Sequence, residues 1–366
     1  ISLVNPVSMP VVTDDSTWHN KEQRVYGKWR PFQLAFVLMN LRAMYDRDCN
    51  ERGIVDLADP VSKYLPGFRN PVVCTADGKI EKAEREILLE DIMNMTSGLT
   101  YGGTDETGRQ TDALFQEVIH GLKEENGGTI STVEFANRLG KVPLLYQPGQ
   151  SWSYGTSADV VGAVIEVASG MRFGDFLKKE IFEPLGMNDT DFWVPAEKQD
   201  RLAKVYDCRE GQPSVRYLDN NLGIQNDMAY RPAYEAGGAG LASTIDDYAK
   251  FTQMLLNGGT YNGVQILRPA TVKFLGGHTL SAVQQAGFDN WIGLEGFSYG
   301  NLMRVLVDPT RAVTLGSKGE FGWDGWLGCY MEVVPEQNMT FLMMTQKKDA
   351  GTYTLSRKIR NIIFSE

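Results

Sequence analysis

One stretch of the sequence carries the residue pattern of a catalytic serine. Residues Gly296–Gly300 match G-x-S-x-G, the turn that presents the nucleophile in α/β hydrolases, with Ser298 at its centre. That fold needs a histidine after the serine in the chain, but the last of the three histidines is His278. The stretch also leads into an expected strand rather than a helix. We therefore interpret it as a chance match.

The cysteines and histidines do not have the spacings of a metal or redox site. The four cysteines (Cys49, Cys74, Cys208 and Cys329) show no C-x-x-C pair. No two of the three histidines lie at helical spacing, so a zinc site is not expected. We expect no metal and no cofactor.

Composition narrows the class of protein. The chain has 366 residues, of which 42% are hydrophobic and 22% charged, and a formal net charge of −10. Such acidity argues against a nucleic-acid partner, and no apolar run is long enough to span a membrane. The first ten residues lack the pattern of a signal peptide. We expect a soluble protein, with the compartment open between the cytoplasm and a secreted or periplasmic site reached after leader removal.

Periodicity predicts a helical region followed by strands. The expected helices before residue 260 are Phe32–Tyr45 (with Pro31 in its first turn), Glu86–Met95, Ser131–Leu139, Ala158–Ser169, Arg172–Phe182 and Ser243–Leu256. The later elements are strands Met303–Val307, Gly328–Val334 and Met339–Met344 and a final helix, Thr354–Phe364. This order predicts an α+β fold in which an antiparallel sheet is flanked by helices and carries an all-helical lobe. We expect 1–31 with 235–366 to form the sheet domain, 32–234 to form the helical domain, and an active site between them.

From Gly53 onward, the sequence resembles the serine β-lactamase-like superfamily. It is most similar to class C β-lactamases, family VIII esterases and D-alanyl-D-alanine carboxypeptidases. The stretches that carry the resemblance, in family order, are Gly53–Pro66, Met95–Leu99, Pro148–Tyr154, Ile181–Met187, Gly238–Thr244 and Gly322–Gly325. The resemblance implies a β-lactamase or penicillin-binding-protein fold and, for an active member, hydrolysis of ester or amide bonds.

Family members transfer acyl groups through a serine and a lysine in S-x-x-K, a tyrosine, and a strand motif that walls the pocket. The resemblance places Tyr154 at the tyrosine that acts as general base. It places Trp323, Asp324 and Gly325 at the strand motif, where Asp324 replaces a small residue. The N–H of Trp326 would then be one oxyanion donor.

The first family element is missing, because S-x-x-K does not occur in the sequence. The best alignment, over Arg24–Pro31, puts Gly27 at the serine and Arg30 at the lysine position. A second alignment places the motif near Lys21–Val25, which also contains no serine. Glycine has no nucleophile and arginine stays protonated, and loss of such a nucleophile typically costs on the order of 10⁶ in kcat.

Three interpretations follow from the missing motif. The first is a pseudoenzyme that binds a small ester, amide or carboxylate between the lobes, in a positively charged pocket containing Arg30, Lys28 and Tyr154. The second is an active esterase, β-lactamase or peptidase with an unidentified nucleophile. Ser97, Ser153 and Ser157 lie near the expected pocket, but none has a lysine or histidine at helical spacing. The third is a rearranged or engineered segment over the first ~50 residues.

Overall fold

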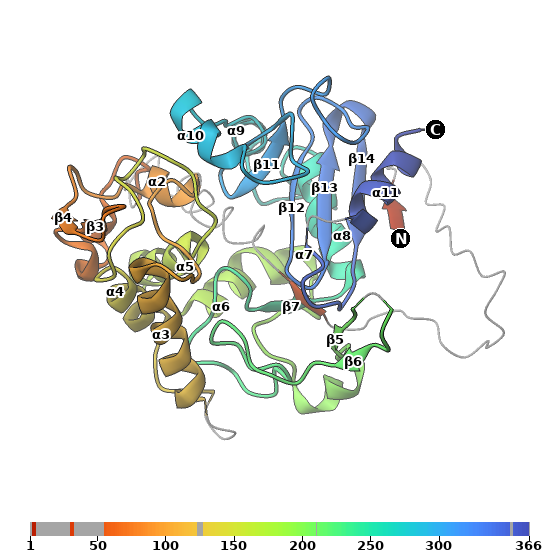
Figure 1. The fold of residues 1–366 in the computed structure, drawn as a ribbon. Helices are drawn as coiled ribbons and strands as arrows, with labels where there is room; N and C mark the ends of the chain where they lie inside the picture. The colour runs from red at the N-terminus through yellow and green to blue at the C-terminus, as the bar shows by residue number, and fades with distance from the viewer. Residues whose placement is uncertain are drawn as a thin grey trace.

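A computed structural model describes residues 2–4, 30–32, 55–122, 127–209, 211–351 and 354–365. Within these ranges the chain forms an antiparallel sheet flanked by helices and a separate helical lobe (Figure 1). The expected α+β fold is confirmed. In the same ranges, no helix combines the length and the apolar character that crossing a membrane requires.

The sheet has six antiparallel strands in the described part of the chain, in the order β1-β14-β13-β12-β11-β10. Their bounds are β1 (Ser2–Val4), β10 (Phe297–Gly300), β11 (Met303–Leu306), β12 (Phe321–Asp324), β13 (Tyr330–Val334) and β14 (Met339–Met343). The three strands expected near residues 303, 328 and 339 are therefore confirmed. Both ends of the described chain contribute to the same side of the molecule, since β1 pairs with β14.

Side-chain alternation along β13 explains how the sheet is covered on both faces. Met331 and Val333 join the main core, which also contains Phe251 of α8 (Ile245–Leu256). Tyr330 instead packs with Phe341 against α11 (Thr354–Ile363), the terminal helix expected from sequence. One helix on each face thus keeps the strands out of water.

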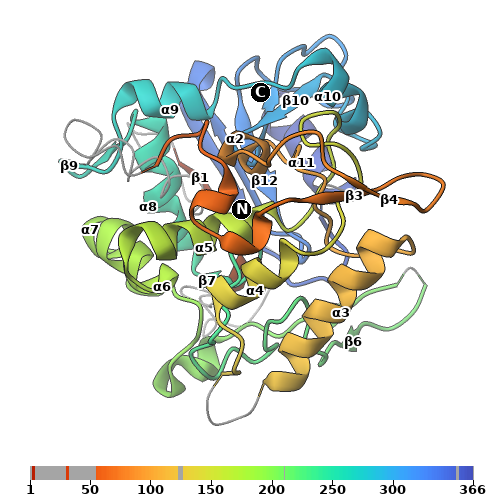
Figure 2. The ribbon, with the colours of Figure 1, turned by 90° about the vertical axis from the view of Figure 1, so that its left-hand side faces the viewer.

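The helical lobe lies beside the sheet and faces the viewer in Figure 2. Its helices are α2 (Leu89–Met93), α3 (Glu106–Gly121), α4 (Thr132–Leu139), α5 (Ser157–Ser169), α6 (Phe173–Leu177) and α7 (Glu183–Leu185), with a π-helical turn at Lys178–Phe182. The helices that follow in the chain are α8, α9 (Pro269–Leu275) and α10 (Ala282–Phe288). The short two-stranded ribbons are β2 (Arg30–Phe32) with β7 (Leu241–Ser243), β3 (Val72–Cys74) with β4 (Ile80–Lys82), β5 (Tyr206–Asp207) with β6 (Val215–Arg216), and β8 (Thr260–Tyr261) with β9 (Val264–Gln265).

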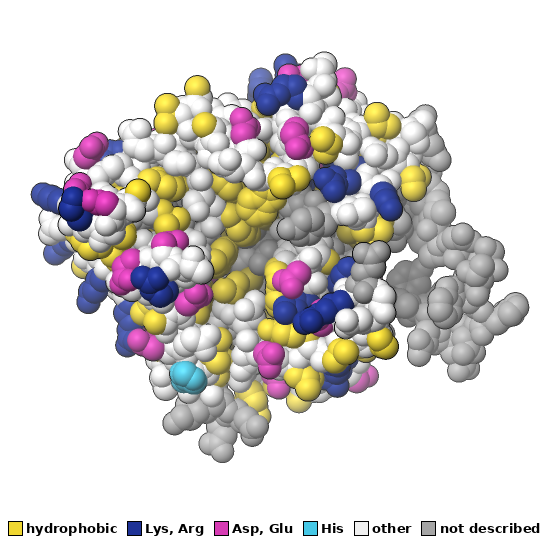
Figure 3. Space-filling view, in the orientation of Figure 1, with side chains coloured by type: hydrophobic (Ala, Val, Ile, Leu, Met, Phe, Trp, Pro, Cys, Tyr) yellow, Lys and Arg dark blue, Asp and Glu magenta, His cyan; other side chains and the backbone are white. Residues whose placement is uncertain are grey.

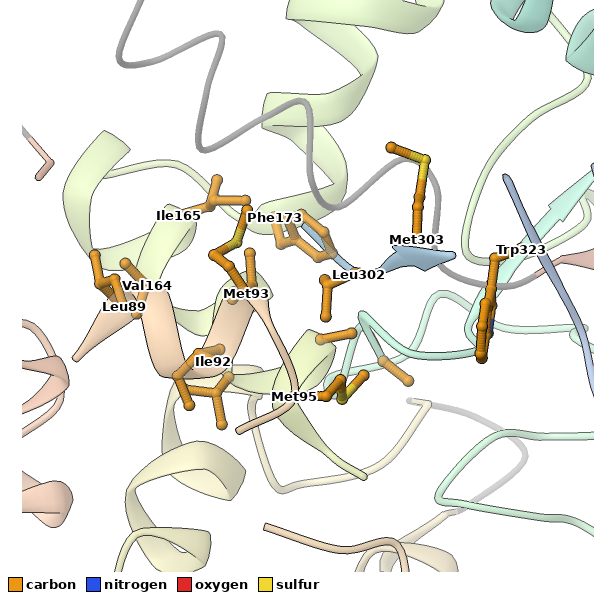
Figure 4. Close-up of a cluster of buried hydrophobic side chains, with 14 of the residues drawn as sticks. Leu89, Ile92, Met93, Met95, Val164, Ile165, Phe173, Leu302, Met303 and Trp323 are labelled. Carbon is orange, nitrogen blue, oxygen red and sulfur yellow. The ribbon is translucent and has the colours of Figure 1, made fainter. Parts of the chain in front are cut away.

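A continuous apolar core joins the lobe to the sheet (Figure 4). Met93 at the end of α2 and Ile165 of α5 lie in this core with Leu302 and Met303 at the start of β11. The backbone N–H of Leu302 also donates to the Met93 carbonyl oxygen at 2.7 Å. The helical lobe and the sheet therefore share one hydrophobic core and are held in a fixed relative position.

Three of the expected helices, α4, α5 and α8, begin or end at a capping residue. The Ser131 hydroxyl accepts from the N–H of Glu134 at 3.1 Å at the start of α4, and Thr244 caps α8 in the same way. Gly170 ends α5 in a left-handed conformation, with φ of 68°. The helix expected over Glu86–Met95 is shorter in the structure, where α2 covers Leu89–Met93.

The expectation that Pro31 opens a helix is wrong. Arg30–Phe32 form β2, and Arg30 pairs with Ser243 of β7 in an antiparallel ladder. A ladder with a distant segment fixes these residues as extended, and no local signal in the sequence announces such a partner. The rest of the expected helix, 33–45, lies outside the described residues. The division into domains 1–31 with 235–366 and 32–234 stays a prediction.

A buried ion cluster ties α11 to the sheet. Arg360 donates to carboxylates of Glu320 and Glu332 and, at 3.1 Å, to the hydroxyl of Tyr330. All three charged side chains are at most 3% exposed. Burial, and then the neighbouring Glu332, raise the pKa of Glu320. Arg360 is the cation that makes two adjacent buried acids tolerable.

Replacing Arg360 with methionine is expected to lower the free energy of unfolding by about 3–5 kcal/mol, because two buried carboxylates lose their partner. The loss should be smaller at acidic than at neutral pH, since protonated carboxyls no longer need a cation. Urea unfolding at both pH values measures it. The exposed neighbour Lys358 provides the control: Lys358→Met should change stability by less than about 0.5 kcal/mol. Equal effects of the two variants would contradict the ion cluster's role.

Candidate functional site

Tyr154 is held in a tight turn between two helices. The N–H of Ser153 donates to the Met95 carbonyl oxygen at 3.0 Å, which ties the turn to the end of α2. Gly155 packs directly on the backbone at Leu99, and a Cβ there would run into the Leu99 carbonyl oxygen. The helix α5 starts two residues later. These contacts fix the direction in which Tyr154 leaves the backbone.

The structure brings Tyr154 and Trp323 together, although 169 residues separate them. The indole N–H of Trp323, on β12, donates to the Tyr154 hydroxyl at 3.2 Å, and the ring centroids are 5.4 Å apart. The sequence prediction assigned both residues to one pocket. Their roles in that pocket stay predictions.

Further aromatic rings surround this pair, and the sequence analysis did not single them out. Tyr101 and Trp291 have ring centroids 5.4 Å and 5.3 Å from that of Tyr154, and Tyr299 lies 5.0 Å from Trp323. Tyr101 follows a family-like motif by two residues, which is a weak signal. Trp291 and Tyr299 come from the sheet side, and nothing in their local sequence indicates the cluster.

The cluster keeps the Tyr154 hydroxyl neutral. Burial raises its pKa above the ordinary value, and the carboxylates of Asp324 and Asp159 raise it further. The hydrogen bond from Trp323 lowers the pKa, but by less than burial raises it. A neutral phenol can donate a hydrogen bond to a ligand, whereas a general base would need a nearby cation to favour the phenolate.

A buried acid lies behind the cluster. Asp159, in the first turn of α5, accepts from the Tyr234 hydroxyl at 2.7 Å and from the N–H of Gly238 at 3.1 Å. Its other carboxylate oxygen has no partner, and neither has the hydroxyl of Tyr101. Burial raises the pKa of Asp159 to about 6. Sequence reasoning missed this residue, because its neighbours in the helix are plainly apolar.

Asp324 has an ion-pair partner inside the sheet. Its carboxylate accepts from the Arg304 guanidinium at 2.6 Å, and both side chains are at most 4% exposed. This pairing gives a structural reason for an acid where the family has a small residue. A binding role for Asp324 stays a prediction.

Gly325 and Trp326 follow β12 and line a groove of about 560 Å³, counting the space that is open to solvent. The Trp326 indole N–H donates to the Asp349 carboxylate at 2.6 Å, so this side chain is held at the groove. The walls are mostly apolar, with Val205, Leu222 and Leu327 among them. Figure 3 shows a hollow between lobe and sheet in which hydrophobic side chains gather.

The positions aligned with the family serine and lysine are Gly27 and Arg30. Gly27 lies outside the described residues. Arg30, which the resemblance aligns with the lysine of S-x-x-K, is in strand β2. A binding role for either residue stays a prediction.

The hydroxyls of Ser97, Ser157 and Ser298 make hydrogen bonds within the protein. The Ser97 hydroxyl lies 3.3 Å from that of Ser157 and accepts from the N–H of Leu99 at 3.3 Å. Ser298, at the centre of the G-x-S-x-G match, lies inside strand β10 and accepts from the N–H of Leu280. A strand interior is not a nucleophile turn, so the interpretation as a chance match is confirmed.

Metal ligands do not gather among the described residues: no group of three or more His, Cys, Asp or Glu side chains there is arranged to hold an ion. The arrangement around Tyr154 is a packed cluster of aromatic rings in which the indole N–H of Trp323 donates to the Tyr154 hydroxyl.

Comparison with known proteins agrees with this architecture. Protein Rv1367c of Mycobacterium tuberculosis is 29% identical over 307 residues, which are 81% of this chain and 72% of that protein. Esterase EstB of Burkholderia gladioli is 29% identical over 335 residues, 87% of this chain and 78% of that protein. EstCE1, a hydrolase with promiscuous acyltransferase activity, has a TM-score of 0.71 at 22% identity, covering 92% of this chain and 85% of that one, which shows the same fold.

The family model described as beta-lactamase matches residues 48–362, which is most of the sequence. The family resemblance seen from Gly53 onward is therefore confirmed, and this chain belongs to the beta-lactamase family.

Proposed function

We propose that this protein is a non-acylating member of the beta-lactamase family that binds a small ester, amide or carboxylate molecule in the groove beside Trp326. The observation that carries the proposal is the sequence before Gly53, where the family has its S-x-x-K motif. No serine occurs between Ser16 and Ser62, so every alignment of the motif within that interval leaves the nucleophile position without a serine.

The state of Tyr154 supports the same proposal. In an acylating enzyme, a tyrosine that removes a proton needs its phenolate stabilised. Here burial and two carboxylates raise the pKa of the hydroxyl. The residue is therefore poorly suited to activate a nucleophile.

An active hydrolase is the second candidate. The retained pair of Tyr154 and Trp323 favours it, together with the similarity to a protein named as an esterase. Its nucleophile would have to be an unassigned residue such as Ser97, Ser153 or Ser157.

Intact-mass spectrometry after incubation with a fluorophosphonate, and separately with a penicillin, separates the two candidates. We expect an unchanged mass, because the sequence contains no S-x-x-K motif, while a known serine hydrolase in parallel is labelled. Circular dichroism must show that the unlabelled protein is folded. An adduct would overturn the proposal, and its loss in Ser97→Ala, Ser153→Ala or Ser157→Ala would locate the nucleophile.

Titration of the tyrosines tests the protonation state of Tyr154. From about pH 6 to about pH 10, the near-ultraviolet absorbance of the folded protein should rise by the same amount as that of Tyr154→Phe, because the raised pKa keeps this phenol neutral. In denaturant the two proteins should differ by one tyrosine out of 15. If the folded wild type showed one more tyrosine ionisation than Tyr154→Phe below pH 10, Tyr154 would be a phenolate base instead.

A further inference from the structure

The groove at Trp326 shares a wall with a second cavity. Ile224 and Gln225 line both the groove and a smaller cavity, of about 260 Å³ when the space open to solvent is counted, whose other walls include Phe192, Met228 and Tyr234. The side-chain oxygen Oε1 of Gln225 is buried and has no hydrogen-bond partner. A buried acceptor without a donor is costly, so it marks a place where a ligand donor would be favoured.

The backbone around Gln225 is firmly held. Asn221 and Ile224 exchange backbone hydrogen bonds of 2.8 Å and 3.2 Å across a two-residue turn. The turn residues Leu222 and Gly223 both have positive φ, 49° and 75°, which leucine rarely adopts. On the other side, the N–H of Asn226 donates to the Asn220 side chain at 3.0 Å. The wall therefore presents Gln225 from a fixed position.

Charge at the groove disfavours an anion. Among the described residues that line it, the charged one is Asp219, which is exposed. At the rim, the Lys348 ammonium lies 5.2 Å from the centre of the Tyr217 ring, but it is also 3.8 Å from the Asp349 carboxylate. Asp219 is thus the charged side chain in the described lining of the groove.

Exposed apolar side chains lie close in the sequence to two residues that line the groove. Tyr206 of β5, Val215 of β6 and Leu218 are 41%, 64% and 66% exposed, next to the groove residues Val205 and Tyr217. Exposed apolar side chains gathered beside a cavity are typical of a surface that receives an apolar group. The hydrocarbon part of a ligand would be covered here.

We propose that the groove selects neutral amides with an apolar chain over carboxylates, and that Gln225 determines this choice by accepting the ligand's N–H. The amide supplies the donor that Gln225 lacks, its chain covers the apolar walls, and its neutrality avoids repulsion by Asp219. The inference rests on the proposed function, because it assumes that the groove binds a small molecule.

Three probes with the same chain test the choice: octanamide, methyl octanoate and octanoate, titrated calorimetrically into the full chain. Octanamide should bind about tenfold more tightly than the ester, which lacks a donor, and octanoate should bind most weakly. In Gln225→Met, which keeps the side-chain length without the acceptor, amide and ester should bind equally well.

Gln253→Met is the matched control. Gln253 also has a buried Oε1 without a partner, but it lies on α8 and does not line the groove. This variant should keep the tenfold preference for the amide. If Gln225→Met keeps the preference as well, the inference is wrong while ligand binding stands. If none of the three probes binds to the folded protein, the inference falls together with the proposed binding function.

Asp219→Asn tests the charge selection separately. Removing the exposed carboxylate should raise the affinity for octanoate about threefold at low salt and leave octanamide unchanged. The gain should shrink as salt is added. An equal change for octanoate and octanamide, or no change for octanoate, would show that Asp219 does not select against anions.

Discussion

The alternation of side chains along β12 is the constraint on which the site depends. Neighbouring residues of a strand point in opposite directions, so Trp323 and Asp324 find different partners. Trp323 reaches Tyr154 in the helical lobe at 3.2 Å, and Asp324 pairs with Arg304 inside the sheet at 2.6 Å. Gly325 and Trp326 follow at once and form the wall of the groove. One short strand thus contacts the helical lobe and the sheet interior and leads into the wall of the groove.

Buried charged side chains of the sheet hold β12 in position. Arg304 is fully buried next to Asp324, and its guanidinium carbon lies 4.7 Å from the centre of the Tyr330 ring. The same tyrosine accepts from Arg360 of α11. Breaking a buried pair leaves an uncompensated charge, so each member of this chain of contacts holds the next. The C-terminal helix is therefore part of the support of the groove, although it is on the far face of the sheet.

Local sequence signals predicted helices and strands better than they predicted which distant residues contact one another. The cap at Ser131, the glycine after α5 and the alternation in β13 are local, and these elements were predicted from the sequence. Pro31 was placed in the first turn of a helix because an apolar run follows it, but its conformation is set by a ladder with β7, more than two hundred residues away. The acid at position 324 could be recognised as unusual, whereas Arg304 could not be identified as its partner without the register of β11 and β12. Gln225 lies in an irregular segment with no periodicity to read, so no sequence pattern could have shown its place in a wall.

The groove lining and the raised pKa of Tyr154 both argue against stabilisation of a negative charge in this region. Proton transfer in a pocket of this fold needs a charge that stabilises the phenolate, but burial and carboxylates act on Tyr154 in the opposite sense. The same lack of positive charge among the described residues at the groove disfavours the anionic ligand that an Arg30 pocket would suit. The groove walls are mostly apolar and include the amide of Gln225, whose oxygen has no partner, and walls of this kind suit neutral molecules better than anions.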